Sequence, residues 1–211
     1  MKKTLIGCVV LALLVSCSSD KKAGSEAASQ PAAKPAVKEA QYETARAAFQ
    51  KMFLAARLWA PDVRPFRLQS QFSPDAPVAE GKASLWRASF ASPSKHMMKL
   101  FAWSGMVGPD APEQGISFSA EDSWSASNSS TQPFDIAFLK VDSDKAYDVA
   151  QKNGGDKLTK KDPTQPVIFL LAWDASKNQL VWHVIYGENP NEAKLRIAVD
   201  ATAGEFLRVE K

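Results

Sequence analysis

The chain has 211 residues, of which 45% are hydrophobic and 23% are charged, and its formal net charge is +3. These proportions are typical of an ordinary soluble globular protein of one or two domains. After the first forty residues the chain contains no basic run beyond the pair Lys160–Lys161, which argues against a nucleic acid as its partner.

The N-terminus has the features of an export signal. Lys2 and Lys3 form a short basic region, and an apolar stretch of eleven residues follows from Leu5 to Val15. A helix of this length is too short to cross a hydrocarbon core of about 30 Å. We therefore interpret residues 1–16 as a signal peptide and not as a membrane anchor.

The end of this stretch, Leu14-Val15-Ser16-Cys17, resembles the lipobox of bacterial lipoproteins. The resemblance implies cleavage between Ser16 and Cys17, attachment of a diacylglyceryl group to the sulfur of Cys17, and palmitate among the acyl chains of the anchor. The alternative is an ordinary secretory signal with an incidental cysteine, but the polar residues 18–20 favour the lipobox. Lipoproteins of this type usually carry three acyl chains, which would make the anchoring to the membrane stable. Ser18 stands where an aspartate would signal inner-membrane retention, so the resemblance implies the outer membrane, facing the periplasm.

Both cysteines of the chain, Cys8 and Cys17, lie in this N-terminal region, so residues 18–211 contain no thiol. An exported body without disulfides must be stabilised by its own core, and a chain of this length can bury enough surface for that. Lys2 and Lys3 precede the cleavage site, so that 24 of the 26 basic residues remain against 23 acidic residues. The mature chain is therefore almost neutral.

Residues 17–40 contain no aromatic side chain and are rich in Ala, Ser, Lys, Pro and Gln, which is typical of a disordered tether behind the lipidated cysteine. Residues 41–120 are predicted to form an N-terminal α+β module. Apolar side chains recur at helical spacings between 41 and 60 and predict a helix that Pro61 stops. Strands are expected over 63–72, 83–91 and 97–103, and shorter ones near 116–118 and 123–124.

Residues 121–211 are predicted to form a C-terminal module of the same kind. An apolar strand is expected over 134–141, followed by a helix that Asp142 or Ser143 caps and that stops at Asn153-Gly154-Gly155. Strands of an antiparallel meander are then expected over 167–173, 180–186, 195–199 and 206–209.

The two strand-rich regions are similar to each other. Trp86 and Trp182 each begin an alternating strand in which an aromatic residue recurs four positions later, and each strand leads through a turn to an apolar partner. We interpret this similarity as an internal repeat. The expected fold class is α+β, with two tandem modules that each pack a helix on an antiparallel β-meander.

The C-terminal module also resembles the PepSY family of exported bacterial domains. The resemblance rests on the helix at 144–150, on Leu180-Val-Trp182-His-Val184, and on the turn Val199-Asp200-Ala201-Thr202-Ala203-Gly204, where the family pattern lacks Ala203. It covers roughly residues 142–211, and residues 42–105 show a fainter similarity of the same kind. It implies a PepSY- or cystatin-like fold, no established catalytic residues, and a role in binding or in restraint of exported peptidases.

Motifs for catalysis or metal binding are not apparent in the sequence after Cys17. His96 and His183 lack metal-ligand spacing, and neither a Gly-x-Ser-x-Gly elbow nor a phosphate-binding glycine loop occurs. We interpret His183 as a packed or surface side chain on a strand. Asp142 and Asp144 precede an apolar helical stripe, which favours helix capping over a catalytic carboxylate pair.

Tryptophan supplies the remaining candidate for a binding contact. Trp86 and Trp182 are expected to point into the core, whereas Trp124 lies among serines and an asparagine and is a weak candidate for an exposed ligand contact. The acidic pair Glu121–Asp122 is interpreted as part of a solvated loop.

These observations predict a membrane-anchored, non-catalytic envelope lipoprotein that binds a protein, a peptide or another envelope ligand, without a cofactor or a metal. Inhibition or regulation of an exported peptidase is the first alternative, and an uncharacterised enzyme is the second.

Overall fold

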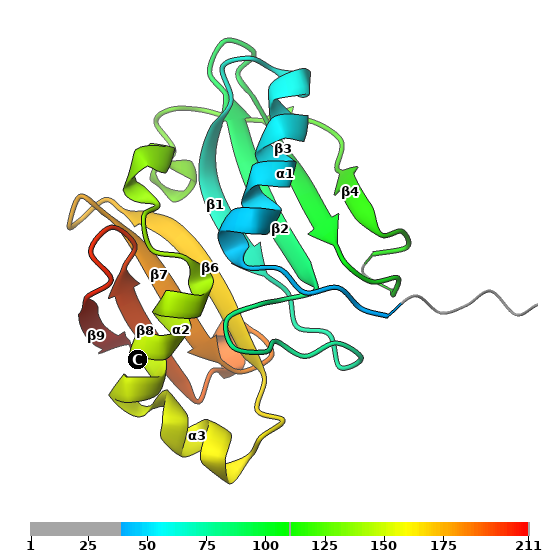
Figure 1. Cartoon of the computed structure of the whole chain (residues 1–211). Helices are drawn as coiled ribbons and strands as arrows, with labels where there is room; N and C mark the ends of the chain where they lie inside the picture. The colour runs from blue at the N-terminus through cyan, green and yellow to red at the C-terminus, as the bar shows by residue number, and fades with distance from the viewer. Residues whose placement is uncertain (1–38, 110, 211) are drawn as a thin grey trace, which may run out of the picture. The chain divides into compact units, whose positions relative to one another are not determined.

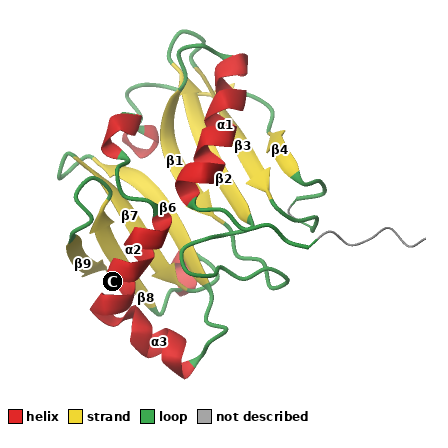
Figure 2. Cartoon of the chain, viewed as in Figure 1, coloured by secondary structure: helices red, strands yellow, loops and turns green. Residues whose placement is uncertain are grey.

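The computed structural model describes residues 39–109 and 111–210, and these residues form an α+β fold around a nine-stranded antiparallel sheet. The strand order is β4-β3-β2-β1-β6-β7-β8-β9, and β5 also pairs with β3. The α-helices lie on one side of the sheet (Figures 1 and 2). Ser16, Cys17 and the rest of the predicted signal peptide and tether up to residue 38 lie outside the described residues.

The N-terminal half agrees closely with the predicted elements. The apolar stripe of the first helix is buried, and the helix ends just before Pro61 as expected. All three predicted long strands and both short ones are present. The elements are α1 (Ala45–Trp59), β1 (Arg64–Ser70), β2 (Leu85–Ser92), β3 (Met97–Ser104), β4 (Gly115–Phe118) and β5 (Asp122–Ser123).

The C-terminal half contains the predicted meander behind a more complex helical region. Its helical segments are α2 (Ser143–Ala150), the π-helical turn η3 (Gln151–Gly155) and α3 (Asp156–Lys161). Its strands are β6 (Val167–Asp174), β7 (Gln179–Tyr186), β8 (Leu195–Asp200) and β9 (Phe206–Glu210). Short 3-10 turns are η1 (Ser129–Thr131), η2 (Ile136–Phe138) and η4 (Pro190–Glu192).

The two meanders share one sheet, so the expectation of two tandem modules is not confirmed. Strand β1 pairs with β6 in antiparallel register, with Leu68 opposite Leu171. Residues after 120 also pack on the N-terminal half: β5 pairs with β3, and the Phe134 N–H donates to the Pro65 carbonyl at 2.8 Å. The halves are therefore joined through a seam of main-chain hydrogen bonds between β1 and β6.

Both tryptophans that were expected to point inward are fully buried, and they occupy equivalent places in the two halves. The indole Nε1–H of Trp86 donates to the main-chain oxygen of Glu43 at 2.9 Å, and that of Trp182 donates to Val141 at 2.9 Å. Each carbonyl precedes the helix of its own half. A buried indole N–H requires such an acceptor, so each tryptophan fixes its helix to its meander.

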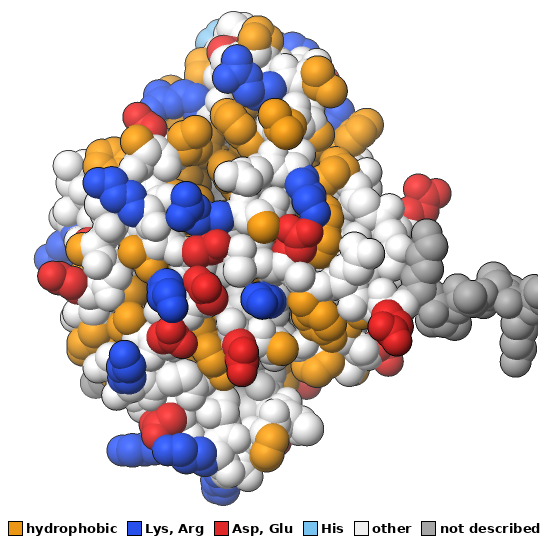
Figure 3. All heavy atoms as spheres, viewed as in Figure 1, with side chains coloured by type: hydrophobic (Ala, Val, Ile, Leu, Met, Phe, Trp, Pro, Cys, Tyr) orange, Lys and Arg blue, Asp and Glu red, His pale blue; other side chains and the backbone are white. Residues whose placement is uncertain are grey.

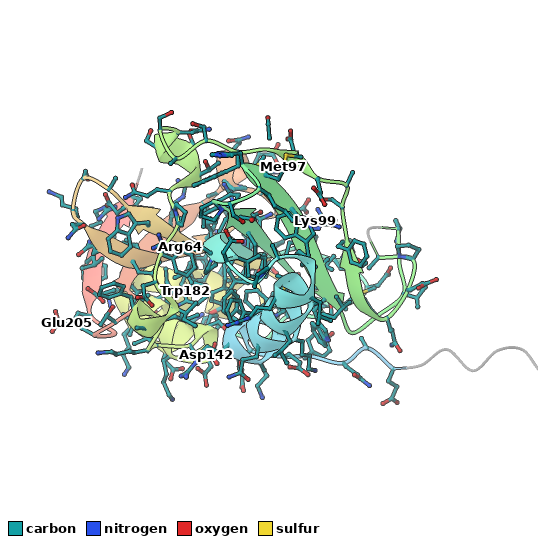
Figure 4. All side chains as sticks on the ribbon, turned by 90° about the horizontal axis from the view of Figure 1, so that it is seen from above. Arg64, Met97, Lys99, Asp142, Trp182 and Glu205 are labelled. Carbon is teal, nitrogen blue, oxygen red and sulfur yellow. The ribbon has the colours of Figure 1, made fainter. Side chains whose placement is uncertain are left out.

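The N-termini of α1 and α2 meet, and Asp142 caps both. One oxygen of Asp142 accepts hydrogen bonds from the main-chain N–H of Ser143 at 2.7 Å and of Arg46 at 2.9 Å. The Ser143 hydroxyl accepts from the Ala45 N–H at 2.9 Å and donates to the Gly81 carbonyl at 2.7 Å. The capping role predicted for Asp142 is confirmed and extends to a second helix (Figure 4).

Two predictions in the C-terminal half are wrong. Residues 134–141 do not form a strand, because the Asp135 carboxylate accepts from the Ala137 N–H at 2.8 Å and closes the turn η2. The helical path does not stop at residue 155 either: it bends at Gly154, whose φ is +118°, and continues as α3. A glycine takes this φ without the steric cost that other residues incur.

Candidate functional site

One face of the sheet is turned away from α1 and α2, and we call it the open face. The opposite face carries Leu68, Phe169 and Leu171, which pack in the core with residues of both helices. Side chains alternate along a strand, so Arg67, Gln69 and Leu170 point to the open face. The helices and the core cover the opposite face, so we looked for a ligand-binding site on the open face.

A hollow of about 250 Å³ lies on the open face at the seam between the halves. Arg67 and Gln69 of β1 line it together with Leu170 of β6 and Ile185 of β7. The loop 188–190, between β7 and β8, forms part of its rim. In the antiparallel pairing of β1 with β6, Gln69 lies opposite Leu170. The pairing therefore places a polar side chain and an apolar side chain next to each other in the lining of the hollow.

Two charged side chains line the hollow, Arg67 on β1 and Glu188 at the rim, and Arg67 is the one with donors to offer. Its Nε–H donates to the Gln69 Oε1 at 2.9 Å, and among the described residues its Nη groups have no hydrogen-bonded partner. Desolvation by the surrounding protein lowers the pKa of Arg67, although the guanidinium stays charged at neutral pH. A partly desolvated cation with unused donors favours a carboxylate or carbonyl group of a ligand.

The outer strands of the open face carry a charged cluster that is satisfied internally. The Nδ1 of His183 lies 2.7 Å from Glu210 Oε2, and the Arg208 Nη2 donates to Glu210 at 2.8 Å and to Asp174 at 3.4 Å. Burial raises the pKa of Glu210, but the His183 hydrogen bond and the cations Arg208 and Arg196 outweigh it, so the pKa lies below its ordinary value. The cluster ties β9 to β7 and to the end of β6.

The histidines and acidic pairs singled out in the sequence lie apart from the hollow. His183 lies on a strand, as expected, and His96 occupies the β2–β3 turn with a φ of +54°. Asp144 accepts from the neighbouring Lys145 N–H at 2.7 Å, and Glu121 accepts from the indole of Trp59 at 2.7 Å. Within residues 39–109 and 111–210, no group of three metal-ligating side chains is assembled.

The prediction that Trp124 is exposed is wrong. Its side chain is 9% exposed and packs against Phe66, Ala91 and Met98. Its main-chain N–H donates to the His96 carbonyl at 3.0 Å, and its indole donates to Thr131 at 3.1 Å. The polar segment around Trp124 folds back over the end of β2 and β3, so its serines face solvent while the indole is buried.

This segment encloses a second hollow, of about 260 Å³, against the N-terminal strands. Phe66, Ser89 and Leu100 line it from the sheet, and Ala120 and Thr131 line it from the segment. Its exposed wall is more apolar than that of the first hollow and offers fewer polar groups for directional hydrogen bonds. Its charged lining residues are Lys99 and Asp122. We therefore regard the seam hollow with Arg67 as the better candidate for specific recognition.

Sequence patterns did not identify this site. Alternation in 64–70 could have placed Arg67 and Gln69 outward, but the hollow exists because β6 lies beside β1, about a hundred residues later in the chain. Such pairing between distant strands leaves no local signal. In the described part of the chain, no helix is long and apolar enough to cross a membrane.

No family model and no curated protein matches the chain, so the resemblance to PepSY domains is not confirmed. One solved structure is similar, that of a protein from Clostridium difficile 630 provisionally classed as a lipoprotein. It is 10% identical, the match covers 77% of this chain and 91% of that one, and the TM-score is 0.51. The two proteins therefore share a fold.

Proposed function

We propose that this chain is a lipid-anchored protein of the bacterial envelope that binds a protein or peptide ligand, without catalysis, in the seam hollow. The proposal rests mainly on the hollow itself, in which the Nη groups of Arg67 are free to donate and lie near Gln69 and apolar side chains. The lipobox-like sequence ending in Cys17 and the similar fold of a protein classed as a lipoprotein support the envelope location.

The lining of the hollow suits a short extended peptide segment. Arg67 can form paired hydrogen bonds with a carboxylate, and the amides of Gln69 and Gln71 can bond with peptide groups. Ile168, Leu170 and Ile185 supply an apolar surface for one side chain of the ligand. The side chains that line the hollow contain no nucleophile paired with a general base, which favours binding over catalysis.

The anchor places this binding on a membrane surface. Lipid on Cys17 would hold the body in the outer membrane, facing the periplasm, and the ligand would be an envelope protein or peptide. Metabolic labelling with a palmitate analogue tests the anchor: the label should enter the chain, and the variant Cys17→Ala should lose it and leave the membrane fraction. Labelling that persists in Cys17→Ala would contradict the proposed attachment site.

The binding role is tested by using the full mature chain as bait for envelope extracts. A captured protein should bind Arg67→Gln roughly tenfold to a hundredfold more weakly, since hydrogen bonds to a charged group contribute about 1.5–3 kcal/mol. Lys161→Gln is the matched control, because it removes one exposed cation from α3, away from the open face. Equal capture by both variants would contradict the assignment of the site.

A further inference from the structure

The solvent side of α1 carries an apolar ridge, which we define as Leu54, Leu58, Trp59 and Phe118. Leu54 is 68% exposed and Leu58 is 91% exposed, one turn apart on the helix. Phe118 of the neighbouring strand β4 is 64% exposed. Figure 3 shows hydrophobic side chains gathered over the part of the molecule where α1 and β4 lie. A cluster of large apolar groups in water marks a surface that another apolar phase covers.

The core does not require the two leucines of this ridge, whereas Trp59 and Phe118 also pack against the buried Phe101. The buried stripe of α1 consists of Ala45, Ala48, Phe49, Met52 and Ala56, on the opposite side of the helix. Polar residues at 54 and 58 would complete an ordinary amphipathic surface helix. Two leucines there instead make α1 apolar on two sides.

Cations surround the aromatic part of the ridge. The Nζ of Lys95 lies 5.2 Å from the centre of the Trp59 ring, and the Nζ of Lys99 lies 4.2 Å from the centre of the Phe118 ring. Arg57 lies between the two leucines in sequence and is exposed. Within residues 39–109 and 111–210, the acidic contact of the ridge is the hydrogen bond from the Trp59 indole to Glu121. Apolar side chains with basic neighbours and a tryptophan are typical of surfaces that lie in the interface of a bilayer.

We propose that the ridge docks on a bilayer surface that contains anionic phospholipid. Leu54, Leu58 and Phe118 enter the boundary between head groups and acyl chains, and Arg57, Lys95 and Lys99 lie at the phosphate groups. The ridge projects from a helix, and a projecting apolar surface fits a deformable lipid phase. The cations beside the ridge attract anionic lipid head groups, which favours a bilayer as the occupant. A second copy of the chain docked on the same ridge would instead place like charges next to each other.

The inference rests on the proposed function in one respect, since lipid on Cys17 holds the body close to the bilayer. Glu39, where the described chain begins, is 22 residues from Cys17, so the connection spans at most about 75 Å. The helix α1 has 15 residues and is about 22 Å long. The far end of α1 is therefore within reach of the membrane that holds the anchor, and weak docking is enough at the resulting local concentration.

The test uses the full lipidated chain in vesicles of phosphatidylethanolamine and phosphatidylglycerol. Apart from Cys17 the mature chain has no cysteine, so Leu58→Cys and the control Lys161→Cys on α3 can each carry a single environment-sensitive fluorophore. Nitroxide-labelled lipids should quench the fluorophore at 58 and leave that at 161 unquenched. Adding Leu54→Asp to Leu58→Cys should lower the docked-to-free ratio about tenfold, and high salt should lower it further.

Equal quenching at 58 and 161 would overturn the proposal. So would a fluorophore at 58 that is shielded from aqueous iodide but not quenched by nitroxide lipids, because that result indicates a second copy or a protein as the occupant. Circular dichroism is the check that each variant is folded. Failure of the anchor is seen separately as loss of co-flotation with the vesicles, and failure of the seam hollow leaves these signals unchanged.

Discussion

The two halves of the sheet repeat in their cores and differ on their surfaces. In both, a buried tryptophan donates its indole N–H to the carbonyl that precedes the helix of that half. The N-terminal half has a continuous 15-residue helix with an exposed apolar ridge, whereas in the C-terminal half an 8-residue helix bends at Gly154 into α3. The two halves are thus alike where these side chains pack, and they differ on their surfaces.

The open face differs between the halves in the same way. The segment around Trp124 covers part of the N-terminal half, while the C-terminal half carries the cluster of His183, Glu210 and Arg208. The seam hollow lies between these two regions, where neither half alone could form it. The proposed binding site therefore depends on the pairing of the two halves in one sheet.

The largest effects are expected from removing the paired tryptophans. Trp86→Ala and Trp182→Ala should each lower the free energy of unfolding by about 3–5 kcal/mol, because each removes a large buried side chain and its indole hydrogen bond. The Val141 carbonyl loses this donor in Trp182→Ala, whereas the Glu43 carbonyl keeps the Ala83 N–H at 3.0 Å in Trp86→Ala. Urea denaturation measures both. A cost for one variant that is several-fold smaller than for the other would show that the two positions are not equivalent.

Directly after the bend at Gly154, the helical path of the C-terminal half packs closely on Tyr186 at Gly155. A Cβ there would lie 1.8 Å from the hydroxyl of the buried Tyr186. Gly155→Ala should therefore cost about 1–3 kcal/mol of unfolding free energy, as expected for overpacking. Thermal unfolding checks this, with Gly108→Ala as control, since its nearest contact is the flexible end of Met106 at 3.2 Å. Equal stability of the two variants would contradict the packing described here.

The contact between the helices of the two halves is tested at Asp142. Asp142→Ala should cost about 1–2 kcal/mol, because it removes the acceptor for the first turns of both α1 and α2. Asp148→Ala is the matched control, as its carboxylate only pairs with the exposed Lys145 across 3.4 Å. Chemical denaturation of both variants should separate them by about 1 kcal/mol or more. Equal losses of unfolding free energy in the two variants would show that the cap shared by α1 and α2 does not stabilise the fold.

The smallest effect concerns two carboxylates, Asp62 at the β2–β3 turn and Asp174 at the β6–β7 turn. Hydrogen bonds from the Ser92 hydroxyl and the Ser94 main chain lower the pKa of Asp62 to about 2, and a hydrogen bond from Ser176 is the main cause that lowers the pKa of Asp174. A carboxylate whose folded-state pKa is depressed stabilises the fold above its unfolded pKa, and this contribution is lost as the pH falls from about 4 towards 2.

Because Asp62 lies near the surface and is only partly buried, solvent screening limits its contribution to below about 1 kcal/mol. The titration of its carboxyl carbon by NMR should show a midpoint near pH 2. Asp62→Asn should flatten the acid dependence of stability in this range. A midpoint near 4 would mean that the pKa of Asp62 is the same in the folded and unfolded states, and this would contradict the prediction.

The sequence predicted the elements better than their arrangement. The strands and α1 carry alternating or helical patterns, and Asp142 was recognisable as a cap because of the helix that follows it. The turn at 136–138 was missed because a single Asp135 hydrogen bond overrides an apolar run. The buried state of Trp124 depends on Phe66 and Met98, which lie far from it in the chain. The β1–β6 pairing, and with it the hollow, is likewise set by contacts between distant residues.

The central claim is that the seam of the two halves forms the ligand site, and photo-crosslinking in living cells tests it most directly. Leu170, which lines the hollow, is replaced in the full chain by benzoylphenylalanine, and Lys161 on α3 is replaced in the same way as control. An adduct should form from position 170 but not from 161, and Arg67→Gln should abolish it. The same adduct from both positions, or one that persists in Arg67→Gln, would contradict the claim.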